Sequence, residues 1–292
     1  MAPSGVARCG NGKTPMTMNS INTNAAAVIA LQSLSATNAQ MAATQKRVST
    51  GYRVGDARDD GGAFAVAQAV RSDVAGIIAV GEQLGGVKGI LQTTFAALSV
   101  VSDTMKQIRA VLTRLADAAI SADQRVTYEA QYELLADQVA KFLDDATYNG
   151  RTLLSTDPLQ NGGNITAIRN ESGGTFTIEA VDGATLKLPP AAPGNSTIAT
   201  SWIVSGGQFD QRDKAISLAL NEFGAAMAFV DNQIKYNSQK VDALEGGLGA
   251  LVDADLAKES SSLEALKVRQ QLGIQTLGLA NQGPQVLLGL FR

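Results

Sequence analysis

One stretch of the chain decides its fold: residues 216–251, which read ISLALNEFGAAMAFVDNQIKYNSQKVDALEGGLGAL. Large apolar residues recur along it at intervals of three, four or seven. These residues are Ile216, Leu220, Phe223, Met227, Val230, Ile234, Val241, Leu244, Leu248 and Leu251. The pattern holds for five heptads without a slip, which is typical of a helix in a coiled-coil-like bundle. The stretch therefore predicts one long bundle helix.

The same spacing occurs earlier in the chain. One run comprises Leu91, Leu98, Val101, Met105, Ile108, Leu112 and Leu115; another comprises Tyr128, Tyr132, Leu135, Val139 and Phe142; a third comprises Ala67, Val70, Val74, Ile77 and Leu84. Residues 16–157 and 194–283 contain no proline, which would cost about 3 kcal/mol inside a helix. We expect at least four long helices, three before the middle of the chain and one after it.

The middle of the chain has a different composition. Residues 155–207 are rich in Gly, Thr, Asn and Pro. Residues 175–181 alternate in polarity, Asp182-Gly183 offers a turn, and residues 184–188 follow, which predicts a β-hairpin. The expected fold class is therefore mainly α: a long helical bundle or coiled coil from the N- and C-terminal segments, with a small β-rich, loop-rich insert. We place the insert at the far end of the bundle and expect it to be dispensable for folding.

Both ends of the chain carry thin apolar stripes separated by small polar residues. The stripes comprise Ile21, Val28, Leu31, Leu34, Met41 and Val48 near the N-terminus, and Leu256, Leu263, Leu266, Leu277, Leu287, Leu288, Leu290 and Phe291 near the C-terminus. Such helices bury little apolar area alone and are marginal in isolation. We expect the two ends to form one inner coiled coil that polymerises with outside partners. The predicted core of the main bundle comprises Leu98, Val101, Met105, Ile108, Leu112, Leu115, Phe223, Met227 and Val230.

Composition excludes several classes of function. The chain has 292 residues, a formal net charge of −3 and only 17% charged residues. It lacks the excess of basic residues that is typical of nucleic-acid-binding proteins. It has no histidine and one cysteine, Cys9, which removes His-based catalysis, Cys-based zinc sites and intrachain disulfides. We predict no enzyme activity, cofactor or metal. No continuous apolar run has the length of a membrane span, and the first 15 residues lack the apolar core of a secretory signal peptide.

Short motifs have ordinary structural interpretations. Gly12-Lys13-Thr14 lacks the first glycine of a phosphate-binding loop, because Ala7 stands there. Asp56, Asp59 and Asp60 suggest a calcium loop, but a turn with capping carboxylates fits better. Three N-x-[ST] sequons begin at Asn164, Asn170 and Asn195, as the composition of the insert leads one to expect. The single tryptophan, Trp202, is expected to anchor the insert.

Several ordered blocks resemble bacterial flagellins over nearly the whole chain from about Met18. They are INTN at 21–24, RVSTGYRV at 47–54, ARDDGG at 57–62, YNGRTLL at 148–154, VDAD at 252–255, ANQGPQ at 280–285 and LLGLFR at 287–292. The resemblance implies a structural subunit that polymerises with copies of itself into the flagellar filament for motility. It also implies flagellar export and capping machinery as partners, and type III export to the extracellular flagellum or cell surface without a cleaved signal peptide.

The resemblance also implies a division of the chain into segments. These are an N-terminal extension at 1–17, expected to be disordered; an inner coiled-coil domain at 18–60 and 252–292; an outer helical domain at 61–157 and 208–251; and the insert at 158–207. Membrane insertion is not expected.

One other class of function remains open at this point, and a third class, an enzyme, is not expected. A flagellin-like chain can act as a surface adhesin for a polysaccharide or host ligand, and the cations Lys106, Arg109 and Arg114 lie near one another on a predicted helix. The alternative for these three residues is an ordinary solvated face. An enzymatic insert of the metalloprotease kind would require histidine, which the chain lacks.

Overall fold

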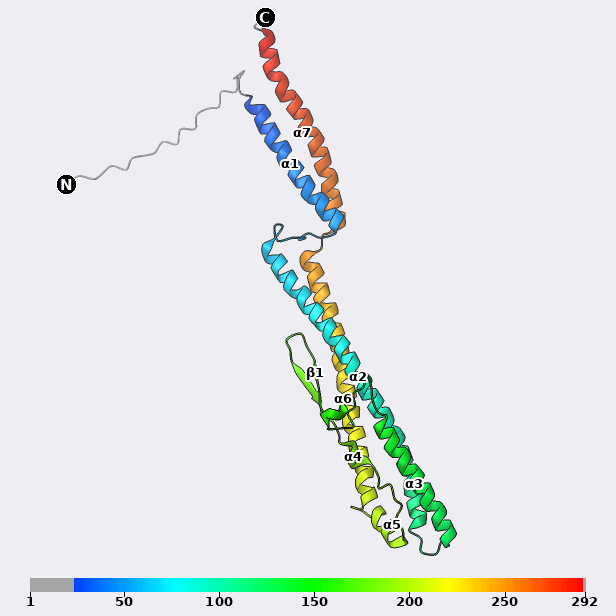
Figure 1. Ribbon diagram of the computed structural model, residues 1–292. Coiled ribbons are helices and arrows are strands. Elements are labelled where there is room, and N and C mark those ends of the chain that lie inside the picture. Colours follow the sequence, from blue (N-terminus) through cyan, green and yellow to red (C-terminus); the bar gives the residue numbers. More distant parts are fainter. Residues whose placement is uncertain (1–23, 291–292) are drawn as a thin grey trace, which may run out of the picture. The chain divides into compact units, whose positions relative to one another are not determined.

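The structure, a computed structural model, describes the backbone of residues 24–290 and the side chains of residues 24–282 except Gln160. The chain divides into two compact units. Unit 1 comprises Met1–Gln68 with Leu248–Arg292, and unit 2 comprises Ala69–Gly247. In unit 1, helix α1 (Ala25–Thr50) runs beside helix α7 (Leu256–Leu290), as Figure 1 shows. The N-terminal extension expected at 1–17 lies outside the described residues.

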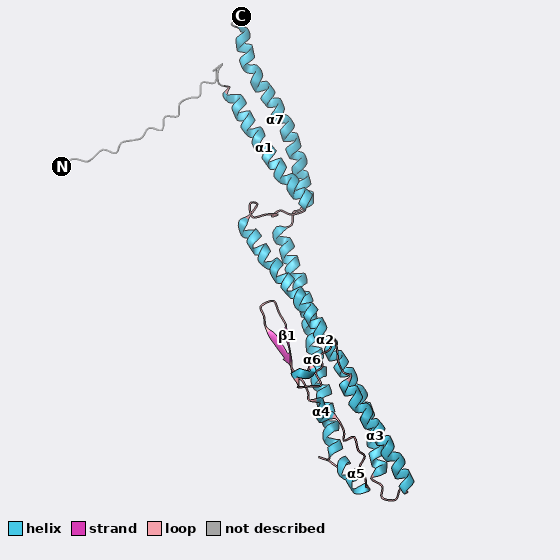
Figure 2. Cartoon of the chain, in the orientation of Figure 1, coloured by secondary structure: helices cyan, strands magenta, loops and turns pink. Residues whose placement is uncertain are grey.

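Unit 2 contains α3 (Ala122–Asp144) and most of two longer helices, α2 (Gly61–Leu115) and α6 (Gln208–Val252). The helical character of both units is plain in Figure 2. Eight of the nine predicted bundle-core residues are buried: Leu98, Val101, Met105, Ile108, Leu112, Leu115, Phe223 and Val230. The ninth, Met227, is half-buried and packs against the same core. The heptad spacing thus gives the correct phase for α2 and α6.

Helix α2 is longer than the sequence pattern indicates. The separate stretches predicted at 67–84 and 91–115 form one continuous helix of 55 residues. Gly85 and Gly86 lie between them, and each glycine costs about 1 kcal/mol relative to alanine in a helix. Buried Leu84, Val87 and Leu91 bracket these glycines, and their packing carries the helix through. By length and composition α2 is apolar enough to cross a membrane. Many of its large apolar residues line the bundle core, while Val66, Ile78 and Val100 are exposed.

The insert contains a β-hairpin, but its predicted pairing is wrong. Strand β1 (Ile165–Ile168) pairs antiparallel with β2 (Thr175–Ile178), and Ile165 lies opposite Ile178. The partner of β2 therefore precedes it in the chain. The expected second strand is instead the short helix α4 (Gly183–Leu186) followed by extended chain. Asp182 explains the difference, because its carboxylate accepts a hydrogen bond from the Ala184 amide at 2.9 Å and caps a helical turn.

The insert also packs along the bundle, whereas the sequence analysis placed it at the far end. Its contributions to the buried core are Ile165, Ala167, Ile178, Leu186, Leu188 and Ala199. At the hairpin tip, the Arg169 carbonyl accepts hydrogen bonds from Gln233 and Asn237 of α6. Glu171 forms an ion pair with Lys240 of the same helix. The insert is therefore part of the core of unit 2, and we no longer expect it to be dispensable for folding.

Helix α5 (Ser196–Ile203) contains Trp202, which anchors the insert as the sequence predicts. The ring of Trp202 packs on Tyr132 of α3 with centroids 5.8 Å apart. The Tyr132 hydroxyl donates to the Pro189 carbonyl at 2.9 Å, and burial raises the pKa of this phenol above its usual value. The 3₁₀ turn η1 (Pro158–Gln160) precedes β1.

The three sequon asparagines serve the backbone. Asn164 accepts from the Ala180 amide, Asn170 from the Gly174 amide, and Asn195 caps α5 by accepting from the Ile198 amide. Asn170 and Asn195 thereby act in a turn and a helix cap, which is the ordinary use of asparagine at such positions, whereas Asn164 links two segments sixteen residues apart in the chain.

Candidate functional site

The candidate site is the pair of terminal helices, α1 and α7, which run antiparallel (Figure 1). Asn24 fixes the start of α1, because its Oδ1 accepts from the Ala27 amide at 3.0 Å and its Nδ2 donates to the Ala280 carbonyl at 2.7 Å. Gly51 ends the helix in a left-handed conformation with φ of 75°, which favours glycine. The sequence thus defines both ends of α1.

A heptad seam joins the two helices. On α1 the partly or fully buried positions recur every three or four residues: Ala27, Ala30, Leu34, Thr37, Met41, Thr44 and Val48. On α7 they are Glu259, Leu263, Leu266, Gln270, Gly273, Leu277 and Ala280. Many of these residues are small or polar, and Leu266 is the only leucine of the seam that is buried. Within the described part of the pair, the seam therefore buries little apolar area.

The predicted polymerisation residues fall into three groups. Leu34, Met41, Val48, Leu263, Leu266 and Leu277 lie in the seam. Val28, Leu31 and Leu256 are at least half exposed; Val28 and Leu31 lie on the outer face of α1, whereas Leu256 precedes the seam residue Leu263 by one heptad. Ile21 and Phe291, and the side chains of Leu287, Leu288 and Leu290, lie outside the described residues. The predicted stripe of α1 therefore combines two different faces of that helix.

Sequence reasoning missed several residues of this region. Thr37 and Thr44 are buried in the seam, and their positions midway between Leu34, Met41 and Val48 would have revealed them. The search for apolar stripes also omitted five exposed apolar residues: Ile29, Val268, Leu272, Ile274 and Leu279. The three- and four-residue spacing of the seam places them on other faces of α1 and α7.

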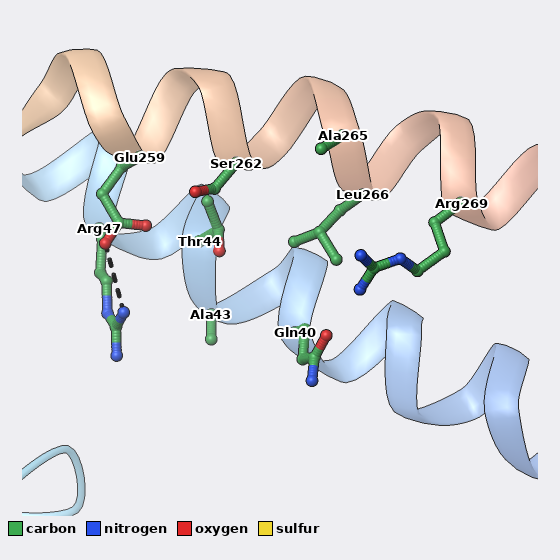
Figure 3. Close-up of a pocket in the computed structure, with 9 residues that line it drawn as sticks. All are labelled: Gln40, Ala43, Thr44, Arg47, Glu259, Ser262, Ala265, Leu266 and Arg269. Atoms are coloured by element: carbon green, nitrogen blue, oxygen red, sulfur yellow. Dashed lines mark hydrogen bonds and ion pairs between the residues drawn. The ribbon is translucent and has the colours of Figure 1, made fainter.

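Polar contacts flank the seam and leave a groove between the helices. Arg47 pairs with Glu259 at 3.3 Å, and Gln270 donates to Asn38 at 2.8 Å. The groove has a volume of about 410 Å³ and a floor of small side chains, including Ala43, Thr44, Ser262 and Ala265. Figure 3 shows the Arg47–Glu259 pair at one end of it. The side chain of Arg269 reaches from α7 toward α1 at the other end.

A short clasp follows α1 and precedes α7. The Arg53 and Val54 amides donate to the Val252 carbonyl at 2.7 and 3.2 Å, and the Ala254 amide donates to Gly51 at 2.8 Å. Val54 and Val252 are buried there with Ala67. The backbone pairing holds together the two segments that enter and leave the helical pair.

Charges reinforce the clasp. Lys46 binds Asp56 at 2.9 Å and Asp59 at 2.8 Å. These hydrogen bonds lower the pKa of both carboxyl groups and raise the pKa of Lys46. Asp60 accepts from the Gly62 and Ala63 amides at 3.0 Å and so caps α2. The prediction of a turn with capping carboxylates is confirmed.

The three cations considered for ligand binding are all engaged. Lys106 pairs with Asp103 at 2.7 Å, and Arg109 pairs with Asp213 at 2.9 Å. The Arg114 guanidinium lies over the Tyr128 ring, 5.4 Å from its centroid. Among the described residues, no group of three or more His, Cys, Asp and Glu side chains could hold a metal ion. The three cations therefore make contacts within the chain.

Two protein-family models match the amino-acid sequence of this chain. The bacterial flagellin N-terminal helical region matches residues 21–157, and the bacterial flagellin C-terminal helical region matches residues 209–291. The chain belongs to the flagellin family. It is a structural subunit of the bacterial flagellar filament, outside the cell, and not an enzyme.

Similar proteins extend this conclusion over almost the full chain. Flagellin FljM of Caulobacter vibrioides is 30% identical over 95% of this chain and 100% of its own length. A flagellin of Brucella melitensis is 34% identical over 94% and 100%, respectively. A putative flagellar hook-associated protein from Vibrio parahaemolyticus shares the fold, with a TM-score of 0.54 and 12% identity over 67% of this chain and 100% of that one.

Proposed function

We propose that unit 1 is the part of this flagellin that assembles the filament, and that unit 2 is the body it carries. One observation supports this proposal above all. Val28 and Leu31 of α1 and Leu256 and Leu279 of α7 are half or more exposed, although α1 and α7 already pack against each other. Exposed large apolar residues at helical spacing mark a surface that another chain covers.

The energetics of α1 and α7 support assembly-dependent folding. Ordering the backbone of one residue costs about 1–2 kcal/mol, and a seam of Ala, Thr and Gly returns little of that through burial. We infer that both ends are at most partly helical in the free subunit and become fully ordered between neighbouring copies. Requiring both ends to order together also restrains polymerisation before export.

The same property suits passage through a narrow channel. We propose that the chain leaves the cell through the flagellar export pathway without cleavage and is added beneath the capping machinery at the filament tip. In the filament, residues 18–60 and 252–292 form the inner domain, residues 61–157 and 208–251 the outer domain, and residues 158–207 the insert.

A truncation tests the role of unit 1. A strain lacking this chain is complemented with the wild type, with a variant lacking residues 282–292, or with a control lacking residues 2–12. Electron microscopy should show filaments for the wild type and the control and none for the C-terminal truncation, while the purified truncated subunit keeps the unfolding transition of unit 2. Normal filaments from the truncated chain would contradict the proposal.

Mass spectrometry of secreted subunits tests the export route. The proposal predicts that secreted and cytoplasmic chains have the same N-terminus. Loss of a leader segment of 15–30 residues, the length of a secretory signal peptide, would show that the chain uses another pathway.

A further inference from the structure

The helical pair carries two outer faces that its own seam leaves uncovered. On α1, a shallow groove is lined by Val28, Leu31, Gln32, Ser35, Ala36 and Ala39. These positions lie on the opposite side of the helix from the seam, given 3.6 residues per turn. On α7, the exposed residues Val268, Leu272 and Leu279 lie opposite its seam in the same way. We call the two surfaces the α1 groove and the α7 ridge.

The α1 groove and most of the α7 ridge have neutral surroundings. Helix α1 contains no charged residue from Ala25 to Gln45, and α7 contains none from Gln270 to Leu290, whereas Val268 at one end of the ridge lies between Lys267 and Arg269. An ordinary solvated helix face carries charges opposite its apolar stripe. Water-facing helices without charges, but with Val28 and Leu279 about two-thirds exposed (65% and 67%), indicate faces that become buried.

The two surfaces also have complementary shapes. Three of the six residues that line the groove have short side chains, Ser35, Ala36 and Ala39. The ridge consists of branched side chains, at Val268, Leu272 and Leu279, separated by one and two helical turns. Large residues that enter a groove between small ones are the basis of close helix packing.

The register of the pair places the two surfaces at the same level. Leu34 packs over Gly273, with its Cδ1 3.2 Å from the position a Cβ would take there. In an antiparallel pair, Ser35 is then level with Leu272, Val28 with Leu279 and Ala39 with Val268. The groove and the ridge therefore have equal lengths and lie back to back, so one subunit cannot pack its own ridge into its own groove.

We propose that the α7 ridge of one subunit packs into the α1 groove of a second copy of this chain. The inference rests on the proposed function of unit 1 and adds the pairing of faces. Because groove and ridge are different surfaces, the contact is heterologous, and each subunit keeps one free groove and one free ridge. Such a contact repeats into a ring or a helical polymer rather than closing as a two-fold dimer.

Cysteine cross-linking tests the pairing. In a Cys9→Ser background, which removes the only cysteine, one subunit population carries Ser35→Cys and another carries one ridge substitution: Val268→Cys, Leu272→Cys or Leu279→Cys. The three ridge positions cover axial shifts between copies. Oxidised mixed filaments should yield dimers that join one chain of each kind, because a disulfide needs Cα atoms about 4.4–6.8 Å apart.

The possible outcomes separate this inference from the proposed function. Filaments of one variant alone should give no dimers, and Thr113→Cys, on an exposed face of unit 2, should not cross-link with Leu272→Cys. Dimers within single-variant filaments would indicate a two-fold contact, and intact filaments with no groove-to-ridge dimer would refute the pairing. Either result would leave the role of unit 1 standing, which only filaments from the truncated chain would contradict.

A second pair of variants tests the inference if the cysteine variants assemble poorly. Ser35→Leu fills the groove and should raise the critical concentration for polymerisation about tenfold, the equivalent of 1.4 kcal/mol. Ser33→Leu places the same side chain on another exposed face of α1 and should have little effect. Equal effects of the two substitutions would overturn the assignment of the groove.

Discussion

Heptad spacing occurs in both units of this flagellin, but the residues at the seam positions differ. In unit 2 the seam residues of α2 and α6 are large, and Leu98, Leu112 and Phe223 are fully buried. In the α1–α7 pair the seam contains Ala, Thr and Gly, while several large apolar residues face outward. A bundle that buries its large residues within one chain is stable alone. Under the proposed function, a pair that exposes them is completed by other chains, so the predictions below separate stability of the monomer from assembly.

The largest effect on the monomer is expected from removing the insert. Replacing residues 161–200 with a Gly/Ser linker exposes the surface that Ile165, Ile178, Leu186 and Leu188 cover. Each such side chain contributes about 1.5–3 kcal/mol when fully buried, so we expect a loss of more than about 5 kcal/mol and a much lower melting temperature for unit 2. An unchanged thermal transition, followed by circular dichroism, would restore the insert to the status of a dispensable addition.

Truncating one leucine in each seam should give unequal losses. Leu112→Ala should cost about 2–5 kcal/mol, because Leu112 is completely buried. Leu34→Ala should cost less than about 1 kcal/mol in the free subunit, since its seam is marginal alone, but should slow polymerisation.

Urea denaturation of the monomers measures both values. Thr113→Ala is the control for Leu112, because Thr113 is the next residue and is exposed; it should be nearly silent. Equal shifts for Leu112→Ala and Leu34→Ala would erase the distinction between the two seams.

Glycine substitutions should sharpen the same contrast. In unit 2, a Cβ at Gly207 would collide with the Ser201 and Trp202 carbonyls, which are backbone groups that cannot turn aside. Gly207→Ala should therefore cost about 1–3 kcal/mol, the usual penalty of overpacking. In α7, a Cβ at Gly273 would lie 3.2 Å from the Leu34 Cδ1, the flexible end of that side chain, and 3.8 Å from its Cβ. Gly273→Ala should leave unit 2 unchanged and increase the helicity of the free ends, seen as a stronger far-ultraviolet helical signal.

How far the sequence predicts this molecule depends on the type of pattern. Heptad spacing correctly places Leu112 and Phe223 in the core, because in their helices the large apolar residues at that spacing lie on one face and that face is buried. It could not separate Leu34, in the seam, from Leu31, on the outer face, because both are leucines of one thin stripe. The predicted hairpin pairing is wrong because Asp182-Gly183 is compatible with a strand turn and with a helix cap, and in the structure the Asp182 carboxylate caps a helical turn. The buried Thr37 and Thr44 were missed because an apolar search omits threonine.

The smallest effect concerns the clasp and its charges. The pKa of Asp59 is lowered mainly by its hydrogen bond with Lys46 and then by the Gly55 amide, which donates to it at 3.0 Å. A carboxyl with a depressed pKa stabilises the fold above its unfolded value, about 3.9, and loses that contribution as pH falls through the depressed value. Lys46, whose pKa is raised, contributes below about pH 10 and loses its contribution above it.

The clasp should therefore be constant between about pH 5 and 10 and loosen in acid below about pH 4. The NMR chemical shift of the Gly55 amide reports this loosening. Asp59→Asn should remove the pH-dependent change in that shift that arises from protonation of Asp59. An amide shift with the same acid dependence in both proteins would assign the effect to another group.

Hydrogen exchange on the free subunit and on the filament tests the central claim most directly. The account predicts slow exchange for buried stretches of α2 and α6 in both states, with fast exchange across Ala25–Thr50 in the monomer becoming slow only in the filament. Strong protection of α1 in the monomer, equal to that around Leu112, would show that the helical pair is stable alone and would contradict assembly-dependent ordering.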